Sequence, residues 1–368
     1  MLRNYMGIIN LEESEKDIRS LTNFRPIGTI PVAGRYRVID FALSNLVNAG
    51  LRHVSVFCKK ETRSLSDHLG AGRPWDLDRK NDGLFVFQHN LLGGDSSLDA
   101  KLFANNMEFI NRSNCEYAIV TSSYMIANVD FDAAAKAYEE SGADIFVIYK
   151  NIDDADKNFL NCDLLKMDDN KKIVNVVKNI GVDKNASVCA EMFILKTKTL
   201  QELMYKAINN GIRKGFNNIV YDSLNTYNIQ GYEFKGYMQC INSIESYYRM
   251  NMDMLNIEKV GELFNKYNPI YTKTKDVPPT VYCENSQVQN SIVADGTIVK
   301  GKVLNSVVSR NVRIGENVEL EGCVILQNAV IKDGTKLKNV IVDKGVTVDE
   351  NTIVQGPKEY PIVLEKKR

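Results

Sequence analysis

Histidine and cysteine are the residue types that most often bind metals or act as nucleophiles, and neither forms a site-like pattern in this chain. The three histidines, His53, His68 and His89, lie apart from one another and from any cluster of cysteines. The seven cysteines include no Cys-x-x-Cys pair, and their number is odd, which argues against a zinc site and against a disulfide framework. We therefore expect no metal ligands in this chain, and structural or surface roles for the histidines.

The charge balance and the hydropathy pattern argue against further classes of function. Lysine plus arginine and aspartate plus glutamate both number 46, so no cationic surplus indicates nucleic-acid binding. No apolar run approaches the ~18–20 residues that span a bilayer, and the first residues turn acidic too early for a signal peptide. The sequence predicts a cytoplasmic protein that binds neither nucleic acid nor membrane.

A six-residue period organises the last third of the chain. Stepping by six from Val312 to Val354 meets valine at every position except Lys336. This period fits neither a helix nor a simple strand, but it is typical of a parallel β-helix in which β-branched residues fill the same inward position of each coil. We expect a β-helix over about 282–356, with Lys336 turned outward or at a stutter.

The first two thirds of the chain alternate expected strands with expected helices. A long helix at 244–264 would close this part, and a proline-containing linker at 265–281 would lead to a β-helix domain with a short tail at 282–368. Such alternation predicts a parallel sheet covered by helices, with ligands beyond the carboxyl ends of its strands. The expected strands are 5–10, 53–58, 115–120 and 144–149, and the expected helices are 39–49, 98–110 and 131–140.

Three segments resemble glucose-1-phosphate adenylyltransferases, a family of sugar-phosphate nucleotidyltransferases. The segments 31–45 (PVAGRYRVIDFALSN), 72–77 (GRPWDL) and 243–253 (SIESYYRMNMD) are similar to three of its motifs. The resemblance implies an α/β fold, with a doubly wound, Rossmann-like nucleotidyltransferase domain at 1–264 followed by a left-handed parallel β-helix. It also implies the family reaction, in which ATP and glucose 1-phosphate give ADP-glucose and diphosphate for glycogen biosynthesis.

The chain departs from this family in the loop that would hold the triphosphate. The family's glycine-rich loop lets the backbone approach the phosphates closely, whereas no glycine lies between Gly7 and Gly28 here. Asp17 takes the place of the loop's arginine. Glu12 and Glu13 add negative charge where the triphosphate would sit, and unit charges ~4 Å apart repel by roughly 1–4 kcal/mol. We expect ATP to bind poorly.

The other family positions depart in the same direction. Ile27 corresponds to a lysine of the family, and Tyr124 and Cys240 correspond to its two metal-binding aspartates. Asn179 corresponds to a lysine that contacts the sugar phosphate, with Lys178 adjacent to it. The resemblance therefore implies no catalytic residue and no metal ligand among these positions. We interpret Cys240 as apolar filler rather than as a redox switch.

Arginines in the best-matched segment are the remaining candidate contacts for a ligand. Arg35 and Arg37 resemble effector or phosphate contacts of the family, although a structural salt bridge explains such arginines equally well. Lys178 is the third candidate, because it lies next to the position of the family's sugar-phosphate lysine.

The combined losses predict a catalytically impaired regulatory subunit of a hetero-oligomeric glucose-1-phosphate adenylyltransferase. Its expected partner is the homologous catalytic subunit, which would hold the Mg²⁺, and self-association is an alternative. Two other functions stay open: an active sugar-phosphate nucleotidyltransferase with a non-standard loop, and a stand-alone sugar-phosphate sensor. A β-helix acyltransferase is disfavoured, because such enzymes commonly use a histidine between coils and none follows His89.

Overall fold

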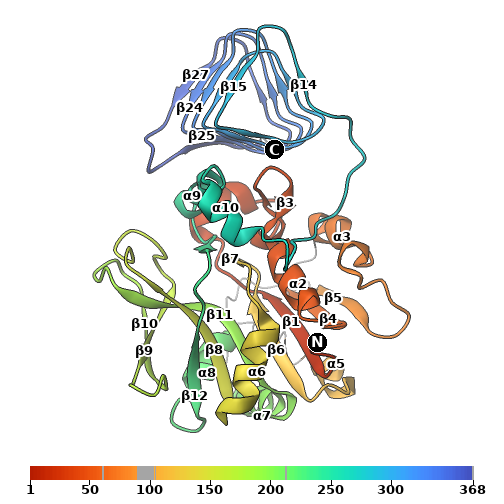
Figure 1. Cartoon of the computed structure of the whole chain (residues 1–368), viewed down its shortest axis with the longest axis vertical. Coiled ribbons are helices and arrows are strands. Elements are labelled where there is room, and N and C mark those ends of the chain that lie inside the picture. The colour runs from red at the N-terminus through yellow and green to blue at the C-terminus, as the bar shows by residue number, and fades with distance from the viewer. Residues whose placement is uncertain (60–61, 89–102, 104, 212–213, 367–368) are drawn as a thin grey trace. The chain divides into compact units, whose positions relative to one another are not determined.

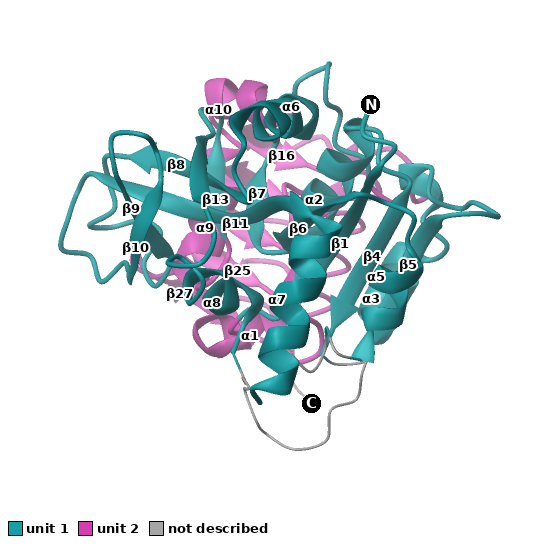
Figure 2. Cartoon of the chain, turned by 90° about the horizontal axis from the view of Figure 1, so that it is seen from below, with its two compact units in different colours: residues 1–13, 39–240, 265–271 teal, residues 14–38, 241–264, 272–368 magenta. Residues whose placement is uncertain are grey.

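The computed structural model describes residues 1–368 except 60–61, 89–102, 104, 212–213 and 367–368 (Figure 1). The chain forms two compact units, each assembled from segments that are distant in sequence (Figure 2). Unit 1 comprises residues 1–13, 39–240 and 265–271, and unit 2 comprises residues 14–38, 241–264 and 272–368. This division differs from the expected domain boundaries at 264 and 282, because two segments from the first two thirds of the chain group with the β-helix.

The strands of unit 1 lie mainly in one mixed sheet. Its described strands are β1 (Tyr5–Leu11), β4 (His53–Cys58), β5 (Gly83–Gln88), β6 (Tyr117–Ser122), β8 (Ile145–Ile152), β9 (Asp163–Met167), β10 (Ile173–Lys178), β11 (Ala186–Lys196) and β12 (Ile229–Glu233). The order is β10–β9–β11–β6–β1–β4–β5, and β8 pairs with both β11 and β12. A separate antiparallel pair joins β7 (Met125–Ala127) to β13 (Met238–Cys240).

The expected parallel sheet is confirmed for one part of this sheet and wrong for another. Strands β6, β1, β4 and β5 pair in parallel, whereas β11 runs antiparallel to both β6 and β8. A parallel connection needs a crossover segment, usually a helix. The chain between β8 and β11 forms instead the β9–β10 hairpin, and β11 then enters the sheet in the opposite direction.

Unit 1 also contains helices, and local capping residues determine where they begin and end. The described helices of unit 1 are α2 (Val38–Asn48), α3 (Arg63–Leu69), α5 (Met107–Arg112), α6 (Phe131–Ser141), α7 (Thr197–Asn209) and α8 (Phe216–Tyr221). Helix α6 begins where the Asp130 side chain accepts a hydrogen bond from the N–H of Ala133, and it ends at Gly142 with φ +67°. Part of the helix expected at 98–110 lies outside the described residues. Among the described residues no helix is long and apolar enough to cross a membrane.

Close packing holds α2 against the centre of the sheet. All seven residues of β1 are buried, as expected for a strand covered on both faces. A Cβ atom at Gly7 would lie 2.8 Å from a methyl group of Leu46 on α2. Glycine at position 7 therefore allows the helix to approach the strand.

Unit 2 contains the expected β-helix, whose coils have a triangular outline (Figure 1). Three parallel five-stranded sheets form its sides. The first sheet comprises β14 (Val281–Tyr282), β17 (Ile298–Val299), β20 (Arg313–Ile314), β23 (Val330–Ile331) and β26 (Thr347–Val348). The second comprises β15 (Gln287–Gln289), β18 (Lys302–Leu304), β21 (Glu319–Glu321), β24 (Lys336–Lys338) and β27 (Ile353–Gln355). The third comprises β16 (Ile292–Val293), β19 (Val307–Val308), β22 (Val324–Ile325), β25 (Val340–Val342) and β28 (Ile362–Leu364).

The coil length explains why one position of the six-step pattern is a lysine. Arg313 pairs with Val330 and Val330 pairs with Thr347, so these coils repeat every 17 residues, one short of three hexads. The six-step therefore shifts by one residue per coil: Val318 is fully buried, whereas Lys336 lies at the outward-facing start of β24 and is exposed. The expectation that Lys336 turns outward is confirmed.

The other segments of unit 2 pack against the β-helix. In chain order they form η1 (Lys16–Ile18, a short 3₁₀ turn), α1 (Arg19–Thr22), a second 3₁₀ turn η2 (Ile27–Thr29), β2 (Pro31–Val32), β3 (Tyr36–Arg37), α9 (Ile244–Asp253) and α10 (Ile257–Leu263). The single helix expected at 244–264 is wrong. The Asn256 side chain accepts hydrogen bonds from the N–H groups of Glu258 and Lys259 and starts a second helix there. On α9, the Tyr248 hydroxyl donates to the carbonyl of Gly322 in the β-helix at 2.7 Å.

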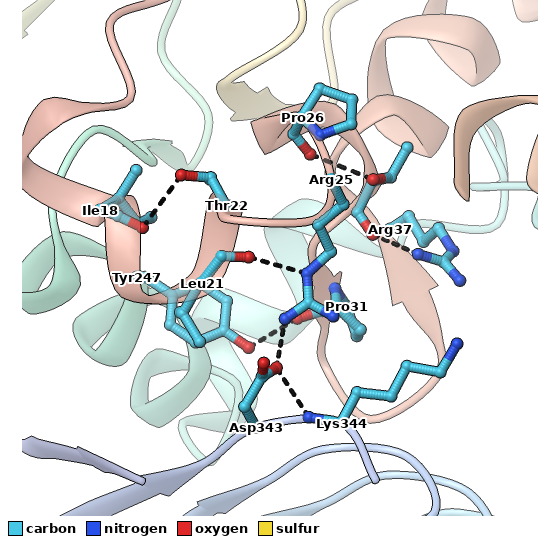
Figure 3. A network of polar contacts seen from close by, with 11 residues as sticks. Ile18, Leu21, Thr22, Arg25, Pro26, Pro31, Arg37, Tyr247, Asp343 and Lys344 are labelled. Carbon is cyan, nitrogen blue, oxygen red and sulfur yellow. Dashed lines mark hydrogen bonds and ion pairs between the residues drawn. The ribbon is translucent and has the colours of Figure 1, made fainter. Parts of the chain in front are cut away.

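A buried ion pair links the N-terminal segment of unit 2 to the β-helix (Figure 3). The Arg25 guanidinium donates to the carboxylate of Asp343 and, through Nε, to the carbonyl of Leu21 at 2.8 Å. The backbone N–H of Lys344 also donates to Asp343. Only 8% of Arg25 and 5% of Asp343 is exposed, so removing one partner would leave the other charge buried.

We expect Asp343→Ala to lower the free energy of unfolding by about 3–5 kcal/mol, the usual effect of breaking a buried pair. The matched control is Asp349→Ala, which removes the exposed carboxylate paired with Lys332 at 2.9 Å and should lower that free energy by no more than about 1 kcal/mol. Urea unfolding of both variants measures the difference. Equal losses in the two variants would contradict a special role for the buried pair.

Candidate functional site

Two acidic side chains lie beside the carboxyl ends of the parallel strands β1 and β6 of unit 1, where such sheets bind ligands; one follows β1, and the other is on β11 next to Met192, which pairs with Thr121 of β6. The first is Glu13, which follows β1. The backbone N–H of Ser123, just after β6, donates to its carboxylate at 2.6 Å. Burial raises the pKa of Glu13, and the hydrogen bonds from Ser123 and the charge of Lys59 offset this only in part. The backbone N–H of Ser123 is therefore committed to a carboxylate of the chain itself.

The second acidic side chain is Glu191 in the middle of β11. The Tyr124 hydroxyl donates to Glu191 Oε1 at 2.6 Å, and the Asn217 side chain on α8 also hydrogen-bonds to this carboxylate. Glu191 has φ +52°, in the left-handed region that favours glycine. The pairing register of β11 with β8 shifts between Cys189 and Phe193, which marks a β-bulge around Glu191.

Both a negatively charged and a positively charged side chain, Asp163 and Lys178, affect the pKa of Glu191. Burial, followed by the negative charge of Asp163, raises the pKa of Glu191 to about 7 against the opposing effects of Tyr124, Asn217 and Lys178. Lys178 Nζ lies 2.7 Å from Asp163 Oδ1. Burial alone would lower the pKa of Lys178, but the nearby Asp163 outweighs it and the pKa is raised. Lys178 is therefore charged and engaged by Asp163.

Cys240 lies at the end of β13, opposite Met125 of β7. It is fully buried and hydrogen-bonds with the equally buried Cys162. Burial, followed by the effects of Cys162, Glu191 and Glu13, holds the pKa of the Cys240 thiol well above its usual range. The protonated thiol is a poor metal ligand. Among the described residues, no group of three or more His, Cys, Asp or Glu side chains is placed to hold a metal ion.

The structure gives the two neighbours Lys178 and Asn179 different roles. The buried Asn179 amide donates to the backbone carbonyls of Ala155, Asn158 and Phe159 at 2.9–3.0 Å. Its side-chain oxygen accepts from the N–H of Gly181. Asn179 therefore holds a turn, and Lys178 is the one of the two that offers charge to a ligand.

The remaining sequence-predicted positions belong to unit 2 and lie in different environments. Asp17 is exposed on η1, and Ile27 is buried in η2. The Arg35 guanidinium lies over the ring of Tyr36, 5.4 Å from its centroid, and is exposed. Arg37 donates to the carbonyl of Thr29 (Figure 3). The structure thus brings Tyr124, Lys178, Asn179 and Cys240 together in unit 1, while the other four positions lie in unit 2.

Arg37 also belongs to a group of cationic side chains within unit 2. Burial lowers the pKa of Lys275, and the positive charges of Arg37, Lys344, Arg310 and Lys273 lower it further. Burial likewise lowers the pKa of Lys344, together with Arg37, Arg25 and Lys366. Like charges that depress one another's pKa are stabilised when an anion binds among them. This cation cluster, defined as Arg37, Lys273, Lys275, Arg310 and Lys344, is therefore suited to an anion.

Sequence reasoning identified only some of the residues that define these two places. Glu13 and Arg37 were named, whereas Glu191 and most of the cation cluster were not. One signal existed for Glu191: it is the single acidic residue within the otherwise apolar run of β11. No sequence signal indicated the cation cluster, because its members come from separate segments of the chain.

Comparisons with known proteins support the fold of both parts of the chain. A family model described as nucleotidyl transferase matches residues 16–175, and one described as GlmU-like, C-terminal hexapeptide matches residues 279–359. The expected fold class, a Rossmann-like nucleotidyltransferase domain followed by a left-handed parallel β-helix, is confirmed.

Similar proteins cover most or all of the chain. It is 35% identical to "Glycogen biosynthesis protein GlgD" of Bacillus subtilis (strain 168), over 100% of this chain and 97% of that protein. It is 33% identical to the protein of the same name from Geobacillus stearothermophilus, over 86% and 82%. It is 30% identical to "Glucose-1-phosphate adenylyltransferase" of Clostridium novyi (strain NT), over 82% and 80%.

The raised pKa of Glu191 predicts a pH-dependent stability. The folded chain holds a proton on Glu191 up to about pH 7, whereas the unfolded chain releases it near the ordinary glutamate pKa of 4.5. Stability should therefore fall as pH rises from about 4.5 to 7. Glutamine at position 191 does not ionise. The free energy of unfolding of Glu191→Gln should therefore be about 2–3 kcal/mol higher than that of the unmodified chain at pH 7.5, with no such difference at pH 4.5.

Urea unfolding at the two pH values measures this effect. The exposed Glu140→Gln, also in unit 1, is the matched control and should keep the profile of the unmodified chain. If Glu191→Gln showed the same pH profile as the unmodified chain, the carboxylate would not be titrating near neutral pH.

Proposed function

Since the chain belongs to the family of the glycogen biosynthesis protein GlgD and glucose-1-phosphate adenylyltransferase, we propose that it is a regulatory subunit without adenylyltransferase activity of its own. Its role lies in glycogen biosynthesis. A cytoplasmic location is part of the proposal. The observation that carries it is the pair of hydrogen-bonded carboxyl groups, Glu13 and Glu191, at the carboxyl edge of the sheet.

Adenylyl transfer needs cations that neutralise phosphate charge and carboxylates that hold a divalent metal. Around Cys240, the described residues provide instead a protonated thiol and two carboxyl groups with raised pKa values. Protein hydrogen-bond donors already occupy both carboxyl groups. Retention of protons disfavours Mg²⁺ coordination, and the carboxyl groups repel a triphosphate whenever they are ionised, which supports the loss of catalysis.

A chain that keeps the fold of a catalytic family can replace one copy in a symmetric assembly. We propose a hetero-oligomer with a homologous catalytic subunit, which would hold the Mg²⁺, and self-association is the alternative. The cation cluster of unit 2 supports a regulatory role, because it is suited to an anionic effector. Arg37 is one of its members, and the exposed Arg35 lies two residues before it. In contrast, Lys178 is engaged by Asp163.

The purified chain alone should form little or no ADP-glucose from ATP and glucose 1-phosphate with Mg²⁺. Cys240→Asp should not restore turnover, because Glu13 and Glu191 still oppose the phosphates and no second metal ligand is added. A coupled assay for diphosphate release measures both proteins. Robust turnover by a preparation free of any catalytic homologue would favour the active enzyme with a non-standard loop instead.

Co-expression with a catalytic homologue should give a complex that co-elutes and turns over faster, or responds differently to effectors, than the catalytic chain alone. Such coupling is typically worth about 1–3 kcal/mol, or roughly 5–150-fold in an affinity. Lys275→Ala combined with Lys344→Ala should weaken the effector response without preventing co-elution. Size-exclusion chromatography and steady-state kinetics test both points. Chains that never co-elute, and kinetics unchanged by mixing, would leave the stand-alone sensor as the better explanation.

A further inference from the structure

Glu191 combines two unfavourable features in one residue of unit 1. Its backbone has φ +52°, which costs a residue with a Cβ atom on the order of 1–3 kcal/mol. Its carboxyl group is sufficiently withdrawn from water to raise its pKa to about 7. Structure that maintains such a residue calls for a functional explanation.

The groups around Glu191 resemble a binding site for an external anion, with the protein's own carboxylate in the anion's place. The Tyr124 hydroxyl donates to it at 2.6 Å, the Asn217 side chain hydrogen-bonds to it, and the positive charge of Lys178 lowers its pKa. The side chain of Lys178 is 61% exposed, so its charge is also accessible from solvent. These groups come from the β6–β7 turn, α8 and β10, and they converge on one carboxylate.

We infer that the Glu191 side chain is an internal stop that occupies an anion-binding position and keeps phosphate esters away from Lys178. This inference rests on the proposed non-catalytic role and gives it a specific physical cause. A phosphate approaching Lys178 would meet the Glu191 carboxylate, and it would have to displace it from Tyr124 and Asn217. Asp163 adds to the exclusion, but its 2.7 Å contact with Lys178 already balances one charge against the other.

Removing the Glu191 side chain should therefore vacate the anion-binding position and let an external anion bind there. Glu191→Gly removes the carboxylate and suits the backbone conformation, because glycine adopts positive φ without strain. The hydroxyl of Tyr124 and the amide of Asn217 then lose their acceptor, and an external phosphate oxygen can replace it. Glu191→Gln keeps the size and removes the charge, which separates blocking by volume from repulsion by charge.

The test is calorimetric titration of the full-length chain with glucose 1-phosphate. Glu191→Gly should bind it at least tenfold more tightly than the unmodified chain, with Glu191→Gln between the two. Asp82→Gly is the matched control, because Asp82 is another acidic residue at positive φ, +64°, and its contact is with His53. It should bind no better than the unmodified chain. Glucose, which lacks the phosphate, should bind weakly to every variant.

Each result bears on the inference separately from the proposed function. Equal affinity of Glu191→Gly and the unmodified chain for glucose 1-phosphate would overturn the inference, as would equal gains from glucose and glucose 1-phosphate. Far-ultraviolet circular dichroism and Glu191→Gln, which keeps the Tyr124 contact, establish that loss of fold is not the cause. Failure of the proposed function would appear elsewhere, as turnover by the unmodified chain or as absence of any complex with the catalytic homologue.

Discussion

The withdrawal of carboxyl groups from water is the constraint on which the candidate site depends. An ionised carboxylate can be buried only when donors or cations compensate for its lost hydration. At the carboxyl edge of the unit 1 sheet, the N–H of Ser123 compensates Glu13 and the hydroxyl of Tyr124 compensates Glu191. Donors that could bind a ligand's phosphates are thus committed to the protein's own acids. At this edge of the sheet, both carboxyl groups are therefore hydrogen-bonded within the chain itself.

Unit 2 depends on a different constraint, the regular stacking of the β-helix coils. Successive coils of the β-helix stack buried β-branched side chains such as Ile314, Ile331 and Val348 in one column, so its stability grows by repetition. The segments 14–38 and 241–264 add irregular structure to this regular surface. They are attached by specific polar contacts, among them Arg25 with Asp343 and Tyr248 with Gly322. The cation cluster draws on both the irregular segments and the coils.

The features that could be predicted from sequence are those in which a local pattern determines the structure. The valine period predicted the β-helix and the outward Lys336, and apolar runs predicted β1 and β4, because neighbouring residues carry these signals. The direction of β11 was missed, since strand direction depends on the connection made by the β9–β10 hairpin. The break after α9 was missed because the Asn256 cap interrupts a helix whose apolar pattern continues. Glu191 was missed because its conformation depends on the bulge and its partners come from three other elements.

The two units show how a chain with zero formal net charge can carry locally opposite charges. Carboxyl groups with raised pKa values, Glu13 and Glu191, lie at the sheet edge of unit 1. Lysines with lowered pKa values gather in unit 2. Each group lowers the local free energy when it meets the opposite charge: protons or cations in the first case, anions in the second. This separation supports the proposed regulatory role, in which phosphates would be repelled in unit 1 and an anionic effector would bind in unit 2.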